Sequence, residues 1–323
     1  MNRRKFIAFP APRRGGAGSF LTVFCLIVLG LSPVHGDQSA TDRVAIVVSK
    51  HIRPYVEAVE GLKSGFSAYA NIVPRVFNLE KLNNQARAGL FEDERVNGFS
   101  LFIAVGPEAA ASVWKGVGNK GPAKLYVMVL HPEKLLGERE KLFGVPLNIP
   151  VGTQVEMIHR GLPSVRQIGL LYDPEHNRAF FRRAADAAAA LNLTVVPLRV
   201  ASKKGIPGAL QGRWTDMDAL WLIPDRTVIS ERIVRYLIKD AFLQQRPVIG
   251  YNRFFYETGA ALAFVFDYRA LGRQCAQQAL RILSGQSCRE TPPVFHVWVN
   301  KGVCDKLGLR YPEEYMPPLS PGP

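Results

Sequence analysis

The sequence lacks the features that mark several functional classes. Only four of its 323 residues are cysteine, which excludes a small disulfide-stapled scaffold. It contains no Gly-x-Ser-x-Gly elbow and no His-Glu-x-x-His or Cys/His pair with metal-ligand spacing. A Gly-x-Gly-x-x-Gly string at 116–121 follows a predicted helix and precedes a strand, the reverse of the order that dinucleotide binding requires. We therefore predict a protein that is not an enzyme and has no resident cofactor or metal.

The composition is that of an ordinary globular protein, with 47% hydrophobic and 21% charged residues. The length favours two domain-sized units, each large enough to bury a core. Basic residues exceed acidic ones, 41 to 27, and five of the basic ones lie in 1–36 with no acid among them. The rest are spread along the chain. This charge favours anionic ligands or a membrane surface and does not indicate nucleic-acid binding.

Residues 1–36 have the pattern of a signal peptide. A basic start precedes the apolar stretch 19–31, which is shorter than the roughly 20 residues that cross a bilayer comfortably. Small residues then lead to Gly36, where we expect cleavage. The alternative is an uncleaved N-terminal anchor. Residues 2–7 also resemble a twin-arginine signal, so both export routes stay open. We predict a periplasmic or other extracytoplasmic protein.

Three cysteines follow the signal segment: Cys275, Cys288 and Cys304. In an oxidising compartment one disulfide can form among them. No two have Cys-x-x-Cys spacing, and we expect buried free thiols.

Short apolar strands alternate with amphipathic helices along the chain. This alternation predicts an α/β protein with two doubly wound parallel-sheet lobes joined by a hinge, divided near 144–150. In such sheets ligands bind outside the carboxyl ends of the strands. The predicted strands are 44–48, 72–77, 101–105, 124–130, 167–172, 194–200, 219–222, 247–249, 260–266 and 294–299. The predicted helices are 54–69, 80–95, 108–114, 152–160, 178–191, 204–212, 228–244, 268–283 and 301–306.

Several segments, in this order and spacing, carry a family resemblance. They are Phe-Gly-Val-Pro-Leu-Asn-Ile-Pro at 143–150, Ile-Gly-Leu-Leu-Tyr-Asp-Pro at 168–174, Met-Asp-Ala-Leu-Trp-Leu-Ile-Pro-Asp at 217–225, Gly-Ala-Ala-Leu-Ala at 259–263, Asp-Tyr-Arg-Ala-Leu-Gly-Arg-Gln at 267–274, and Asn-Lys with Lys-Leu-Gly-Leu at 300–309. Over roughly 42–312 the chain resembles ABC transporter substrate-binding proteins of the type I periplasmic group with tryptophan/tyrosine-type receptors.

The resemblance implies two α/β lobes joined by three crossovers that close over a small ligand. It also implies delivery of that ligand to a membrane permease, and no chemistry of its own. We expect the first lobe at 37–145 with 251–287, the second at 146–250 with 288–313, and a tail at 314–323.

Four candidate ligand contacts follow strands of the predicted first lobe. Ser49 and Lys50 follow the first strand, where a helix N-terminus suits a carboxylate; the alternative for Ser49 is a helix cap. Pro107 stands where the family usually has threonine, so a hydroxyl that could bind a carboxylate is absent. Its other role is to open helix 108–114. His131 follows the fourth strand, and a lone histidine is more often a surface or hydrogen-bonded residue.

Four further candidates follow predicted strands of the second lobe. Tyr172 could stack on a ring, and Asp173 could pair with an amine or form a turn before Pro174. Asn177 is either an amide donor or a cap for the helix from 178. Asp225 could bind an ammonium group or cap the helix from 228.

The last candidates lie in an aromatic cluster and at a strand end. Tyr251, Asn252 and Arg253 could line an aromatic pocket, with Arg253 on a carboxylate, or pack under a crossover loop. Asp267 fits either a cleft or a cap.

The family resemblance, together with the signal-peptide pattern, implies a monomeric, exported solute-binding protein of an ABC importer. Its partners would be a small organic solute, an amino acid or an aromatic carboxylate, and an ABC permease, with no nucleic acid. The alternative is a periplasmic sensory or scaffold protein of the same fold that signals to a protein partner.

Overall fold

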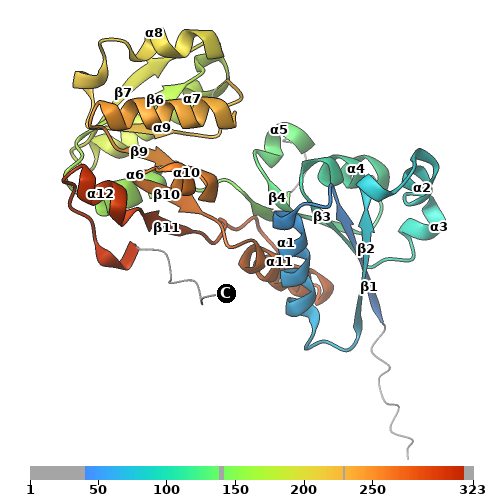
Figure 1. The fold of residues 1–323 in the computed structure, drawn as a ribbon. Coiled ribbons are helices and arrows are strands. Elements are labelled where there is room, and N and C mark those ends of the chain that lie inside the picture. Colours follow the sequence, from blue (N-terminus) through green and yellow to red (C-terminus); the bar gives the residue numbers. More distant parts are fainter. Residues whose placement is uncertain (1–40, 138–141, 228–229, 316–323) are drawn as a thin grey trace, which may run out of the picture. The chain divides into compact units, whose positions relative to one another are not determined.

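The computed structural model describes residues 41–137, 142–227 and 230–315 (Figure 1). They belong to one compact unit, Ala40–Pro323. The predicted signal peptide and residues 316–323 of the predicted tail lie outside the described residues. Among the described helices, none combines the length and the apolar character that a membrane span needs.

The first part of the chain forms a five-stranded parallel sheet (Figure 1). Its inner strands are short runs of mostly buried apolar residues, a pattern typical of parallel strands that helices cover on both faces. The strand order is β2-β1-β3-β4-β5, so the direction of winding changes between β1 and β3. The strands are β1 (Asp42–Val48), β2 (Ile72–Asn78), β3 (Leu101–Val105), β4 (Ala123–Val129) and β5 (Gly144–Pro146).

Helices cover both faces of this sheet, and together they form the first lobe. On one face, α1 and α11 bury apolar side chains against β1, β3 and β4. On the other face, α4 and the short helices after β2 cover the sheet. The helices are α1 (Arg53–Phe66), η1 (Leu79–Lys81), α2 (Asn84–Gly89), α3 (Asp93–Val96), α4 (Pro107–Val117), α5 (Pro132–Leu136) and α11 (Tyr268–Leu283).

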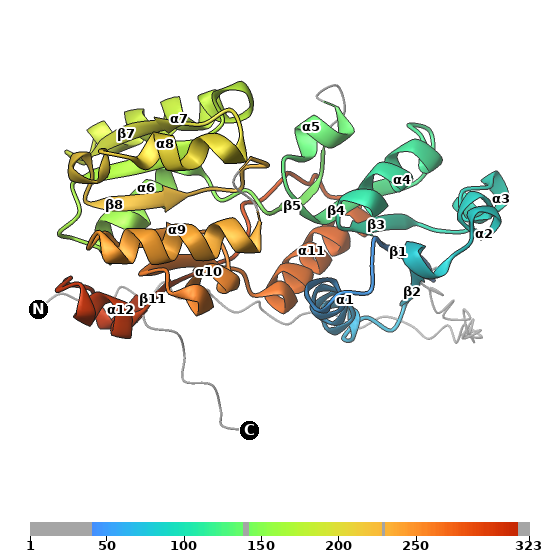
Figure 2. The same ribbon diagram turned by 45° about the horizontal axis from the view of Figure 1, so that its top comes forward.

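Helices α1 and α11 lie side by side at unusually close range (Figures 1 and 2). Glycines permit this approach. A Cβ atom at Gly272 would overlap the carbonyl oxygen of Ala58, and one at Gly61 would overlap that of Arg269. Backbone contact therefore joins the 268–283 segment to a helix more than 200 residues earlier in the chain.

The later part of the chain forms a six-stranded sheet in the order β11-β10-β9-β8-β6-β7. All neighbouring strands are parallel except β10 and β11. The direction of winding changes between β6 and β8. The strands are β6 (Gln167–Tyr172), β7 (Thr194–Arg199), β8 (Ala219–Leu222), β9 (Val248–Gly250), β10 (Leu262–Val265) and β11 (His296–Val299).

This sheet and its helices form the second lobe. Helices α6, α7 and α12 pack on one face, around the buried Trp221. Helices α8, α9 and α10 pack on the other (Figure 2). The helices are α6 (Val151–Gly161), α7 (Pro174–Ala189), η2 (Lys203–Gly205), α8 (Ile206–Leu210), η3 (Trp214–Asp216), α9 (Glu231–Leu243), α10 (Arg253–Thr258), α12 (Lys301–Lys306) and η4 (Glu313–Tyr315).

The chain passes between the two sheets three times, as the family resemblance implies. The crossovers are 147–150 between β5 and α6, 266–267 between β10 and α11, and 284–295 between α11 and β11. The third is held to the first lobe, because Gln278 donates to Thr291 at 2.6 Å and to the Gly144 carbonyl at 3.1 Å.

The sheet pairing corrects part of the expected domain division. We assigned 251–287 to the first lobe, but β10 pairs with β9 and β11, and Phe255 of α10 lies in a core of the second lobe. The transfer to the first lobe comes only after β10. Sequence alternation missed this because every parallel strand reads as the same short apolar run, whichever sheet it joins.

Most predicted strands and helices are present, with bounds that shift by a few residues. The predicted helix at 80–95 is instead the three short helices η1, α2 and α3, with Asn78 and Asn83 capping the first two. The predicted helix at 228–244 is α9, and its residues 228–229 lie outside the described residues. Helices α5 and α10 and strand β5 were not predicted, since they are too short to show a period.

Candidate functional site

A cavity of about 550 Å³ lies at the carboxyl ends of strands from both sheets. Its walls come from the segments after β1, β4, β8 and β9, from α7, and from residues in or next to the crossovers. Sites for small organic ligands have this size and place in α/β folds. Four of the twelve sequence-predicted contacts line it: His131, Asn177, Tyr251 and Asn252.

Three tyrosines supply aromatic wall and hydroxyl groups. Tyr55 comes from α1, Tyr268 from α11, and Tyr251 follows β9. Burial raises the pKa of Tyr55 and of Tyr251 to about 12 and also raises the pKa of Tyr268, so all three stay protonated at neutral pH. None of their hydroxyls has a hydrogen-bond partner among the described residues, so each can bond to a ligand. Further aromatic lining comes from Phe180, Phe264 and Phe266.

His131 and Asn148 form the polar edge on the first-lobe side. The His131 amide donates to Asn148 Oδ1 at 2.8 Å, and the backbone of His131 is left-handed, with φ of 52°. The ring Nδ1 lies 3.1 Å from Asn148 Nδ2 and 3.2 Å from Glu133 Oε1. Burial lowers the pKa of His131, Lys134 lowers it further, and Glu133 opposes them. The neutral imidazole is therefore favoured.

Helix α7 presents a polar, an aromatic and a charged side chain to the cavity. Asn177, Phe180 and Arg183 line it at a spacing of three residues, which places them on one helix face. We expected the helix to begin at 178, but it begins at Pro174. Asn177 is a kink inside it, with φ of −125° and ψ of 16°.

Asp225 holds that kink through hydrogen bonds and does not itself line the cavity. Its Oδ2 accepts from the Asp173 amide and from Asn177 Nδ2, both at 2.8 Å, while Oδ1 accepts from the Thr227 amide at 2.8 Å. The residue is 1% exposed. Its oxygens are occupied by the chain, so Asp225 makes neither predicted contact: it is not placed for an ammonium group, and the cap of α9 is Ser230.

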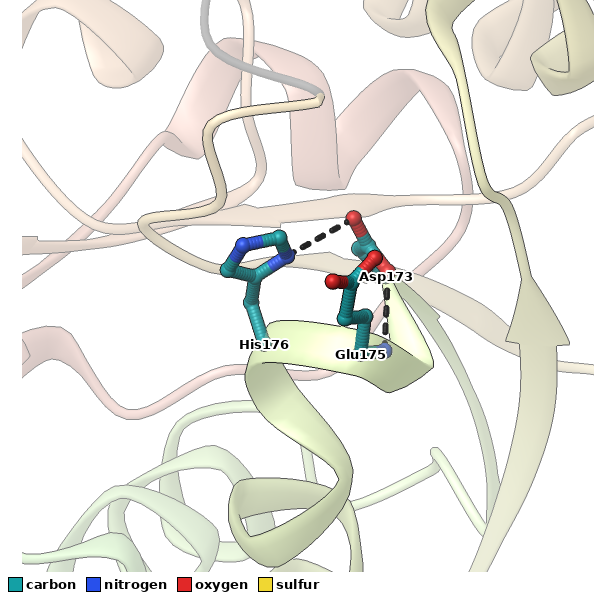
Figure 3. Close-up of side chains that lie close together, drawn as sticks. All are labelled: Asp173, Glu175 and His176. Carbon is teal, nitrogen blue, oxygen red and sulfur yellow. Dashed lines mark hydrogen bonds and ion pairs between the residues drawn. The ribbon is translucent and has the colours of Figure 1, made fainter.

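Asp173, Glu175 and His176 lie close together at the start of α7 (Figure 3). Their spacing would suit a metal ion, but the Asp173 oxygens already have partners. Oδ1 accepts from the Glu175 amide at 2.9 Å, and Oδ2 lies 3.0 Å from His176 Nδ1 and 3.1 Å from Thr227 Oγ1. Burial acts to raise the pKa of Asp173, but these hydrogen bonds outweigh it and lower the pKa. Asp173 is a helix cap outside the cavity.

The N-terminus of α4 is occupied by the chain itself. Ser49 Oγ accepts from the Ala109 amide at 2.9 Å, and Pro107 at the first helical position has no N–H. Gly106, with φ of +90°, leaves room for the Ser49 and Tyr55 side chains that a Cβ atom would displace. Lys50 Nζ lies 3.2 Å from Glu108 Oε1. Ser49, Lys50 and Pro107 do not line the cavity.

The remaining predicted contacts also lie elsewhere. Tyr172 is buried and stacks on Phe181 with ring centroids 5.0 Å apart. Arg253 and Asp267 line a separate hollow of about 380 Å³. There Arg253 pairs with Glu257 at 2.7 Å, and Asp267 caps α11 by accepting from the Ala270 amide at 2.9 Å.

Sequence reasoning missed several cavity residues. Tyr55 lies inside predicted helix 54–69, and Tyr268 is the first residue of predicted helix 268–283, so neither was a candidate. Arg183 lies inside predicted helix 178–191, away from any strand end. Asn148 and Glu290 lie in crossovers, where no strand or helix period exists to reveal which way they face. The cysteines Cys275, Cys288 and Cys304 are free, and burial raises the thiol pKa of each.

The two-lobed fold with a cavity at its strand ends defines a ligand-binding protein of the type I periplasmic kind. A substrate-binding protein with adhesive properties from Clostridium difficile, in its ligand-free open structure, is 17% identical with a TM-score of 0.71, and covers 85% of this chain and 98% of that one. An ABC domain from Streptococcus pneumonia in complex with L-Trp is 18% identical, with a TM-score of 0.58 and coverage of 85% and 97%. A conserved domain protein from Vibrio cholerae is 20% identical, with a TM-score of 0.56 and coverage of 85% and 97%.

Residues 137–317, more than half of the chain, match the ABC transporter substrate binding protein family. The chain belongs to this family, as the resemblance in its sequence indicated. No curated protein matches it in sequence.

Proposed function

We propose that this chain is an exported solute-binding protein of an ABC importer. It binds one small organic solute in the cavity of about 550 Å³ and delivers it to a membrane permease. The observation that carries the proposal is the lining of this cavity. Tyr55 and His131 come from one lobe, and Asn177 and Tyr251 come from the other.

Because its contacts come from both lobes, a bound solute can shift the equilibrium between two arrangements of the lobes. A ligand shifts a conformational equilibrium only by its difference in affinity between the two states. A solute that touches Tyr55 and Tyr251 together favours the arrangement in which both tyrosines reach it. The three crossovers are the segments that would bend, and a permease would recognise the ligand-bound arrangement.

The aromatic wall supports a solute with a flat apolar part. Tyr55, Tyr251, Tyr268 and Phe180 offer ring faces and edges at the cavity. The pneumococcal structure of the same fold contains L-Trp. An amino acid or an aromatic carboxylate is therefore the class that we propose. Binding rather than catalysis is the role that the family supports.

A thermal-shift screen of the purified protein tests the proposal. The panel contains amino acids, aromatic acids, small peptides, nucleosides and purines. A solute present at a hundred times its dissociation constant stabilises the folded state by about 2.7 kcal/mol, so the midpoint rises. A shift with one chemical class supports a receptor. A cooperative transition that no solute shifts would contradict it and favour a protein that signals to a partner.

Export is tested separately. The chain is expressed in a bacterial host, and the N-terminus of the periplasmic product is read by mass spectrometry. We expect it to begin near Asp37. A product that stays in the cytoplasm at full length would contradict export, and a full-length product in the membrane fraction would favour the uncleaved anchor.

A further inference from the structure

If the chain binds a solute as proposed, the charged groups at the cavity decide which class of solute it selects. We propose that Arg183 binds the carboxylate of the solute, and that the site does not require an α-ammonium group. The solute is then a ring-bearing carboxylate and not obligatorily an amino acid.

Arg183 is a cation at the cavity without a partner in the described part of the chain. It lines the cavity one helical turn beyond Phe180, and no hydrogen-bond or ion-pair partner for it is found among the described residues. Its charge lies close enough to act on His131 of the first lobe. A planar guanidinium suits a carboxylate, because it can donate two parallel hydrogen bonds.

The carboxylates near the cavity already have partners. Glu290 accepts from the Tyr126 hydroxyl, and Glu133 lies 3.2 Å from His131 Nδ1. Asp173 and Asp225 would be the natural partners of an ammonium group, but they are buried behind the wall and hold backbone and side-chain donors. Both carboxylates that line the cavity are therefore engaged by the chain at one oxygen, and neither buried aspartate lines it.

The unused groups are mostly donors. The hydroxyls of Tyr55, Tyr251 and Tyr268 stay protonated and lack partners among the described residues. Asn252 uses its Oδ1 to cap α10 and leaves its amide N–H groups available. A site with these spare donors and the Arg183 guanidinium fits a ligand rich in acceptor oxygens.

The N-terminus of α4, at the switch point of the first sheet, is not open to an anion, because Ser49 occupies its Ala109 amide and Pro107 removes an N–H. Among the described residues that line the cavity, the guanidinium of Arg183 is the fixed positive charge.

The test compares matched ligands by titration calorimetry on the purified protein. One set is 3-phenylpropanoate, L-phenylalanine and 2-phenylethylamine; the other is indole-3-propanoate, L-tryptophan and tryptamine. We expect each acid to bind within tenfold of its amino acid or more tightly, and each amine at least tenfold more weakly than the acid. An amino acid or amine that binds more than tenfold more tightly than the acid overturns the inference.

A variant assigns the effect to the residue. Arg183→Gln should weaken binding of the acid roughly 10- to 100-fold, as expected for loss of a charge-assisted hydrogen bond. The affinity for the neutral 3-phenylpropanamide should stay unchanged. Arg182→Gln is the matched control, since Arg182 is an exposed arginine on the same helix, as Arg183 is, but does not line the cavity. Acid affinity that is equal in Arg183→Gln and the wild type also overturns the inference.

Failure of the inference and of the proposed function are distinguishable. If both ligand sets fail but another class in the screen binds, the receptor stands and the carboxylate inference is wrong. If no solute of any class shifts the melting transition, both are wrong.

Discussion

Asn177 and Asp225 are joined inside the second lobe, with Asn177 Nδ2 2.8 Å from Asp225 Oδ2. One residue belongs to α7 and the other follows β8, 48 positions later. The bond holds the helix at its kink, and the residues that follow, Phe180 and Arg183, face the cavity. A buried carboxylate thus sets the direction of a helix face that we assign to ligand binding.

Replacing this carboxylate should cost much of the folding free energy. Asp225→Ala leaves the amides of Asp173 and Thr227 and the Asn177 side chain without acceptors in a buried place. We expect the free energy of unfolding, measured with urea, to fall by about 3 kcal/mol. Asp216→Ala, which removes only a surface pair with Arg213, should cost less than about 1 kcal/mol. Equal losses would contradict the structural role of Asp225.

Gly272 should resist even the smallest substitution. A methyl group there overlaps the Ala58 carbonyl, so Gly272→Ala must push α11 away from α1. We expect destabilisation of about 1–3 kcal/mol, measured by chemical unfolding. Gly152→Ala is the matched control: it also lies in a helix, but its Cβ would meet no atom within 4 Å. That change should be neutral or stabilise by up to about 1 kcal/mol. A stable Gly272→Ala protein would mean that the helices are not in backbone contact.

A variant of Ser49 distinguishes its role as a helix cap from a role in binding the ligand. Ser49→Ala removes the acceptor of the Ala109 amide and should lower stability by about 1 kcal/mol. Because Ser49 does not line the cavity, affinity for any solute found in the screen should stay unchanged. Calorimetric binding and urea unfolding of the same variant give both readouts. A large loss of affinity with unchanged stability would restore Ser49 as a contact.

His131 should make the folded state sensitive to mild acid. Burial holds its pKa below the ordinary 6.5, so the unfolded chain binds a proton more readily than the folded one. The stability contribution is then present above about pH 6.5 and is lost as the pH falls toward the lowered value. The facing groups Glu133, Asn148, Lys134 and Arg183 set the size of the effect.

The measurement is urea unfolding at pH 7.5 and pH 5.5. The decrease in stability should be smaller in His131→Asn than in the wild type, and Asn keeps a polar side chain at this edge. His296→Asn serves as the control because its side chain is exposed. An equal decrease in wild type and His131→Asn would contradict the assignment.

Local patterns were enough for the fold class. Short buried apolar runs such as 101–105 and amphipathic stretches such as 268–283 show their pattern in neighbouring residues, so strands and helices could be predicted directly. Together with motifs such as 168–174 they predicted two parallel-sheet lobes and the family, and both are confirmed. The expectation of a site at the strand ends also came from this pattern, because the carboxyl ends of parallel strands share one edge.

Tertiary structure decided which strand-end residues face the cavity. Asp173 and Asp225 had the right place in the sequence, but each turned inward to satisfy buried amides, which would otherwise lose their hydrogen bonds. Arg183 lies well inside α7, away from a strand end, and Tyr268 lies just after one as the first residue of α11; both line the cavity in the folded chain. Sequence by itself determined the elements, which depend on local period, and the family, which its motifs resemble. The directions of side chains such as Asn177 and Ser49 depend on partners 48 and 60 residues away, and only the folded chain brings these together.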